Sequence, residues 1–169
     1  MTELSGKKLG VTTLEDISTL ILQSHDLDET LNNIVDLVAR RTAADVCSIY
    51  LLDENETTLR LSATRGLSPE SVGQVTMELG EGLTGLVVEE GRVVATEEAQ
   101  DHPRYRYFQE TGEEQFHSFL GIPLLDRKKT IGVLVIQTRD PRSFNTEEIS
   151  ALSAIAFQVA SIVINARLL

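Results

Sequence analysis

The stretch that decides the fold is Phe119–Leu125 (FLGIPLL), a charged turn at 126–129 (DRKK), and Ile131–Thr138 (IGVLVIQT). Two apolar runs rich in branched side chains flank four consecutive charged residues, which is the pattern of two strands joined by a tight turn. Strands connected in this way pair antiparallel. The sequence therefore predicts a β-hairpin here.

A second hairpin is predicted earlier in the chain. Val46–Leu52 (VCSIYLL) has the composition of a strand, residues 53–56 (DENE) form the turn, and Leu59–Thr64 returns. Three weaker patterns, two short strands and a short helix, cover Gln74–Leu79, Val93–Thr96 and 80–91. Together these segments predict a central antiparallel sheet of five to six strands.

Both ends of the chain have a helical pattern. Apolar residues recur three and four positions apart from Thr13, from about Asp28 to Thr42, and from Asn145 onward. Asp26 or Asp28 can cap the second helix, and Asn145 can cap the last. Terminal helices on one face of an antiparallel sheet give an α+β domain, with loops and short helices forming a pocket on the other face.

One domain of ordinary size is predicted over residues 13–169, after a polar, flexible segment at 1–12. No helix-ending signal follows Leu169, so we expect the last helix to continue and the chain to be the N-terminal part of a longer protein.

The composition is that of a soluble, acidic protein. Apolar residues make up 41% of the chain, and 26 Asp and Glu against 15 Lys and Arg give a net charge of -11. Such a surface repels phosphate backbones and anionic headgroups, so no nucleic-acid or membrane partner is expected. The chain has no apolar run of transmembrane length, no signal peptide and a single cysteine, Cys47, all of which favour a cytoplasmic location.

Alternation along Val46–Leu52 separates two faces. Ser48 and Tyr50 share one face, and the residues between and beside them form a purely apolar one. The apolar face suits packing under the terminal helices, whereas a mixed face suits a pocket in which a few polar groups orient a ligand. This argument directs Ser48, Tyr50 and, on the later strand, Gln137 into a cavity. Tyr50 has the alternative of packing in the core with its hydroxyl at the rim.

Residues 80–85 (GEGLTG) match the Gly-x-Gly-x-x-Gly pattern of dinucleotide sites. The helix that follows would end at Gly91, however, which is too short for a βαβ crossover. We favour glycines that shape a tight turn into a short helix beside the pocket. The N-terminus of that helix can still attract an anionic group of a ligand.

Other catalytic signatures are weak. The three histidines, His25, His102 and His117, lack the spacing of a metal site. Cys47 lies in a predicted strand, where a buried structural thiol is expected rather than a nucleophile. No Ser–His–Asp arrangement has support from spacing. We therefore expect no catalytic residue, no metal and no cofactor.

Several motifs resemble, in order, those of the GAF family, which is related to PAS domains. They are residues 80–85 with Gly91, 101–105 (DHPRY), 118–124 (SFLGIPL), 131–134 (IGVL) and Phe144 before the last helix. Each motif alone is weak, but their order and spacing are specific, and the resemblance covers about residues 14–168. It implies the GAF fold and a regulatory, non-catalytic, small-molecule-sensing domain.

In the GAF family the loop that corresponds to residues 101–105 forms one wall of the ligand cavity. The resemblance and the strand alternation together nominate eight ligand-binding residues: Ser48, Tyr50, Gly82, Thr84, Asp101, Tyr105, His117 and Gln137. The alternative for the loop is structural, with Asp101 capping, Arg104 paired to a carboxylate and Tyr105 packed on the sheet. The alternative for His117 is a local bond to backbone.

A subfamily resemblance rests on residues 116–121 (FHSFLG) and 163–167 (VINAR). They are similar to the N-terminal domain of nitrogen-branch phosphotransferase-system Enzyme I, a phosphoenolpyruvate-protein phosphotransferase. This implies nitrogen-related regulation, with glutamine or 2-oxoglutarate as the effector. It also implies that phosphoryl transfer belongs to later domains.

The terminal helices also predict a homodimer. They carry more apolar surface than one side of a sheet needs, in second stripes formed by Ala151, Ile155, Ile162 and Leu169 and by Leu14, Leu20 and Leu22. Two helices from each protomer can build a four-helix bundle. The alternative is one broad core-facing stripe in a monomer.

Two rival functions remain open. One is a ligand-free dimerisation module whose cavity is filled by its own side chains. The other is a sulfoxide reductase of the GAF type, which needs a set of cysteines where this chain has one. The Asn-Lys…Phe-Asp-Glu signature of cyclic-nucleotide GAF domains is also missing.

Overall fold

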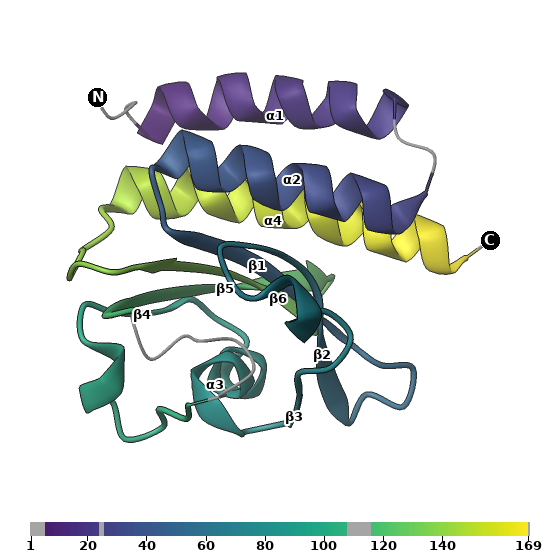
Figure 1. Ribbon diagram of the computed structural model, residues 1–169. Helices are drawn as coiled ribbons and strands as arrows, with labels where there is room; N and C mark the ends of the chain where they lie inside the picture. Colours follow the sequence, from purple (N-terminus) through teal and green to yellow (C-terminus); the bar gives the residue numbers. More distant parts are fainter. Residues whose placement is uncertain (1–5, 24–25, 108–115, 169) are drawn as a thin grey trace.

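The computed structural model describes residues 6–23, 26–107 and 116–168, with side chains from Thr13 onward (Figure 1). Its helices are α1 (Gly6–Gln23), α2 (Leu27–Thr42), α3 (Gly82–Glu90) and α4 (Thr146–Arg167). Its strands are β1 (Val46–Leu52), β2 (Thr58–Arg65), β3 (Thr76–Glu78), β4 (Val94–Thr96), β5 (Ser118–Asp126) and β6 (Lys129–Thr138). Two single 3-10 turns, η1 (Pro69–Ser71) and η2 (Ala99–Asp101), complete these elements.

The strands form one sheet in the order β3-β2-β1-β6-β5-β4, and every adjacent pair is antiparallel. The hairpins β1–β2 and β5–β6 are the two that the sequence predicts, and β1 and β6 join them at the centre. The α+β prediction with a sheet of up to six strands is confirmed.

Local signals explain where the helices begin. The Asp26 carboxylate accepts a hydrogen bond from the Glu29 amide at 2.8 Å and caps α2. Asn145 and Glu148 form a reciprocal capping box at the start of α4.

The predicted start of α1 is wrong. The helix begins at Gly6 instead of Thr13, so most of the predicted flexible segment is helical. Packing of α1 along α4 outweighs the weak helix propensity of this glycine-containing stretch.

Figure 1 shows a layered arrangement in which α2 and α4 lie on one face of the sheet and α1 lies outside them. One apolar cluster fills the space between the sheet and these helices and includes Cys47 and Ile49 of β1. A second cluster lies on the opposite face under α3 and includes Tyr50. The predicted alternation of β1 is therefore confirmed.

Helix α4 is buried on two sides, by the sheet and by α1. For this reason the predicted second stripe is wrong in part: Ala151 and Ile155 belong to the core, Ile162 is half-buried, and Leu169 lies outside the described residues. The large apolar side chains exposed on the terminal helices are instead Leu22, Phe157 and Leu168. By length and composition α4 would also suffice to cross a membrane, but its inner face is part of the domain core.

Candidate functional site

A cavity lies on the sheet face opposite α2 and α4. Strands β5 and β6 supply its floor, the first turn of α3 one wall, and Tyr105, Arg106 and Phe116 another. Ten residues line it: Met77, Gly82, Leu83, Thr84, Ala99, Tyr105, Arg106, Phe116, Phe119 and Gln137. Its volume is about 20 Å³, which is enough for roughly one water molecule.

Glycines bring α3 close to the sheet and shape its first turn. Gly80 and Gly82 have φ of +82° and +69°, a region that favours glycine. A Cβ on Gly121 of β5 would lie 2.6 Å from a methyl group of Val87, so the helix reaches the sheet only because Gly121 has no side chain. The interpretation of residues 80–85 as a turn into a short helix is confirmed.

Segment 102–107 forms the wall that faces α3. The Arg104 guanidinium donates to the Gly80 carbonyl and, at 2.9 Å, to Glu89. Arg106 pairs with Glu81, the residue just before α3. One part of the expected structural alternative, the pairing of Arg104 with a carboxylate, is therefore confirmed.

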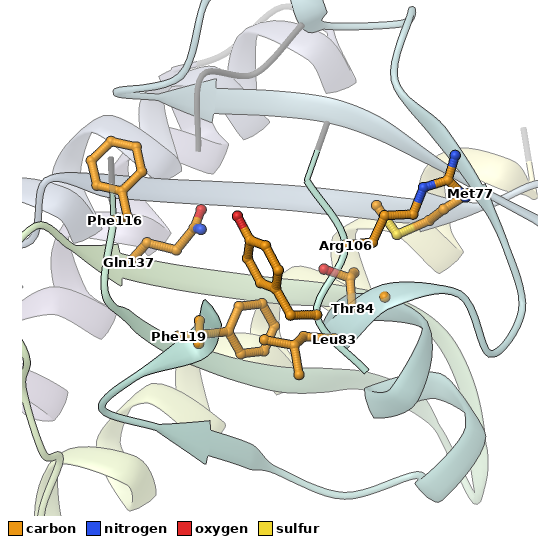
Figure 2. A pocket seen from close by; sticks show the side chains of 10 residues that line it. Met77, Leu83, Thr84, Arg106, Phe116, Phe119 and Gln137 are labelled. Atoms are coloured by element: carbon orange, nitrogen blue, oxygen red, sulfur yellow. The ribbon is translucent and has the colours of Figure 1, made fainter. Parts of the chain in front are cut away.

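Gln137 is the most informative polar residue of the cavity. It lies on β6 between Val46 of β1 and Phe119 of β5, and it is 5% exposed. Figure 2 shows its amide directed toward the centre of the cavity, with Thr84 on the opposite side. Among the described residues, none forms a hydrogen bond with this side-chain amide. The amide is not one of the fully buried, unpaired polar atoms among the described residues, and the cavity beside it has room for about one water molecule.

Four of the eight nominated residues line the cavity, namely Gly82, Thr84, Tyr105 and Gln137. The other four lie outside its lining, and their contact with a ligand stays a prediction.

Ser48 is fully buried and bonds to the Thr64 hydroxyl at 2.8 Å, and Tyr50 packs inside the second cluster. Asp101 ends η2 and is exposed. The His117 ring contacts the Glu98 carboxylate at 2.8 Å on the surface instead of bonding to backbone.

Six lining residues were not predicted from the sequence: Met77, Leu83, Ala99, Arg106, Phe116 and Phe119. Phe119 could have been found by alternation. Leu120, Ile122 and Leu124 of β5 belong to the helix-side cluster, which directs Phe119 and Gly121 to the other face. Arg106 lies in an irregular loop, where no periodicity could indicate its direction.

Thiol and metal chemistry find little support in the described part of the chain. Cys47 is fully buried, and desolvation raises the pKa of its thiol, which suppresses the nucleophilic thiolate. Within the described ranges, no three His, Cys, Asp or Glu side chains are grouped so that they could hold a metal ion.

Comparison with known proteins gives the family. The sequence model of the GAF domain matches residues 24–163. A phosphoenolpyruvate-dependent phosphotransferase system protein of Escherichia coli (strain K12) is 35% identical over 94% of this chain. The chain spans only 21% of that relative's length. A Nif-specific regulatory protein of Azospirillum lipoferum is 29% identical over 78% of this chain and 22% of its own length.

Comparison with solved structures points to the same family. The crystal structure of the GAF domain from an Acinetobacter phosphoenolpyruvate-protein phosphotransferase has a TM-score of 0.84 and 38% sequence identity, and the match covers 94% of both chains. The family match, the extent of the identity and the shared architecture lead to one conclusion: the chain belongs to the GAF domain family.

Proposed function

We propose that the chain is a regulatory domain that senses a small molecule, dimerises through α1 and α4, and signals to further domains of a phosphotransferase. In this role it is soluble and cytoplasmic, and its own residues are non-catalytic. Phosphoryl transfer would belong to domains outside these residues, since the chain corresponds to about a fifth of its phosphotransferase relative.

The buried amide of Gln137 carries the sensing proposal. This amide faces the cavity and has no hydrogen-bond partner among the described residues, so a water molecule or a ligand has to complete its hydrogen bonds. A ligand that donates to or accepts from the amide would take the place of that water. Thr84 and the first turn of α3 add hydroxyl and backbone groups around the same cavity, and apolar walls provide contact area.

Glutamine and 2-oxoglutarate are the effectors we propose to test. The relatives include a phosphotransferase-system protein and a nitrogen-fixation regulator, which supports a nitrogen-related signal. Both molecules carry carboxylate groups that suit a helix N-terminus.

The test compares thermal shifts of the wild-type chain with glutamine, 2-oxoglutarate and cyclic nucleotides. A cognate ligand at a hundred times its Kd stabilises the fold by about 2.7 kcal/mol, which for a domain of this size raises Tm by roughly 5–10 °C. A flat response to all these compounds, from a folded chain, would count against the proposed effectors.

The variant Gln137→Leu sharpens the result. Replacing a cavity-facing amide that has no partner among the described residues should leave the ligand-free Tm equal or higher, while the ligand-induced shift shrinks. The control is Gln74→Leu, at an exposed glutamine outside the cavity, which should change neither quantity. If the ligand raises the Tm of Gln137→Leu as much as that of the wild type, Gln137 is not part of the binding site.

Exposed apolar side chains support the dimer. Leu22 on α1 is 87% exposed, and Phe157 on α4 is 69% exposed. Analytical ultracentrifugation should show a dimer that Phe157→Glu dissociates. Leu79→Glu is the control, because Leu79 is also exposed but lies outside α1 and α4, and this change should leave the dimer intact. A monomeric wild-type chain would contradict the dimer.

The rival function is a ligand-free dimerisation module, and the small cavity favours it. About 20 Å³ admits a water molecule and excludes an amino acid. This rival predicts a dimer with no thermal shift, whereas the sensing function requires the cavity to enlarge.

A further inference from the structure

The cavity must open before any effector can enter it. Ligand pockets typically enclose about 300–1,000 Å³, whereas this cavity encloses about 20 Å³. One of its walls therefore has to move, and the contacts of each wall indicate which one.

The floor and α3 are firmly held. The floor belongs to β5 and β6, which pair along their full lengths at the centre of the sheet. Helix α3 contacts both strands, and its Val87 is fully buried against Gly121. Moving α3 would expose this packed apolar surface to water.

Segment 102–107, which we call the arginine strap, is less firmly held than the floor and α3. None of its residues is fully buried, and it belongs to no strand or helix. Its arginines make polar contacts to α3 and the preceding turn: Arg104 with the Gly80 carbonyl and Glu89, and Arg106 with Glu81. Tyr105, half-buried, also packs against the second apolar cluster. The Arg104 side chain is 33% and that of Glu89 54% exposed, so water and salt reach this pair.

We propose that the cavity opens along the seam between the arginine strap and α3, and that the contacts of Arg104 and Arg106 hold it closed. This inference rests on the proposed sensing function. It assigns the two arginines to control of access, because breaking their partly exposed polar contacts and moving one half-buried tyrosine exposes less apolar surface than separating α3, with Leu83, Leu86 and Val87, from the sheet. Ligand entry should then be favoured by whatever weakens the strap contacts.

Hydrogen–deuterium exchange of the ligand-free chain tests this directly. Arg104→Met keeps the aliphatic stem but removes both guanidinium contacts. Arg92→Met is the matched control, since Arg92 also pairs with a glutamate of α3, Glu90, but lies outside the cavity. Loss of a charged hydrogen bond and an ion pair predicts that exchange in segments 82–87 and 102–107 rises about tenfold in Arg104→Met. The control should exchange as the wild type does.

Segment 46–52 of β1 serves as the internal reference for global stability. Unchanged exchange in Arg104→Met, or an equal rise in Arg92→Met, overturns the proposal. An equal rise in β1 also overturns it, because opening would then be global unfolding instead of a local event.

Salt provides a second measurement that needs no variant. Raising ionic strength from about 0.05 M to about 1 M shortens the Debye length several-fold. Exchange of the wild type in the two segments should then rise, and exchange of Arg104→Met, which retains only the Arg106–Glu81 pair, should rise less. If the exchange rate of the wild type does not depend on salt, the proposal that the strap contacts hold the cavity closed is wrong. Because neither measurement uses a ligand, failure of this proposal can be distinguished from failure of the effector screen.

Discussion

Replacing Gly121 with alanine tests the close approach of α3 to the sheet, on which the cavity wall depends. The added Cβ would lie 2.6 Å from Val87 Cγ2, about 1 Å short of an ordinary carbon–carbon contact. Val87 is β-branched and fully buried, so its methyl group cannot rotate away freely. Overpacking of this kind costs about 1–3 kcal/mol. Alanine recovers about 0.5–1 kcal/mol of backbone entropy relative to glycine, which leaves a net loss of about 1–2 kcal/mol.

Urea unfolding of a double-mutant cycle measures this coupling. Val87→Ala alone leaves a small void and should cost about 2 kcal/mol. In Gly121→Ala/Val87→Ala the new methyl group fills part of that void, so the double variant should be at least about 1 kcal/mol more stable than the sum of the single changes predicts. A Gly121→Ala chain as stable as the wild type, with additive effects in the cycle, would refute the close approach.

Three further predictions concern stability. In Asn145→Ala the α4 capping box is lost, and the free energy of unfolding in urea should fall by about 1 kcal/mol. Gly66→Ala should cost about 3 kcal/mol in the same assay, because φ there is +106° and a Cβ would lie 2.1 Å from the Asp45 carbonyl oxygen. Burial raises the pKa of the Cys47 thiol, so above about pH 8.5 the unfolded chain releases a proton that the folded chain keeps, and stability should fall by up to about 1.4 kcal/mol per pH unit. The Cys47→Ala chain should lack this component, and a difference between the two that does not vary with pH would contradict it.

The sheet and its two hairpins could be predicted because their signals are local. Turn residues and alternating side chains lie within a few positions of each other, as in β5 and β6 around residues 126–129. The start of α1 was missed for the opposite reason. Gly6 and Gly10 weaken the local helix signal, and the packing on α4 that stabilises this stretch comes from residues over a hundred positions away.

The wall of the cavity shows a similar limit. Residues 101–105 were expected there, and Tyr105 does line the cavity. Arg104 and Arg106 are separated by one residue, yet one covers Gly80 and the other pairs with Glu81. Gly80 and Glu81 lie 24 and 25 positions earlier in the chain than Arg104 and Arg106. In an irregular loop no periodicity relates neighbouring side chains, so such pairings become visible only in three dimensions.

Strand alternation assigns Ser48 and Gln137 to the same face, yet of the two only Gln137 lines the cavity. Ser48 lies opposite Thr64 of β2, and the two hydroxyls bond at 2.8 Å. Gln137 lies between Val46 and Phe119, neither of which has a polar side chain to offer. Alternation determines the face of a polar residue, but cross-strand neighbours determine whether it is satisfied, and these are known only once the register is known. Under the proposed sensing function, a polar side chain that faces the cavity without a polar neighbour across the strand is the position where a ligand would complete a hydrogen bond.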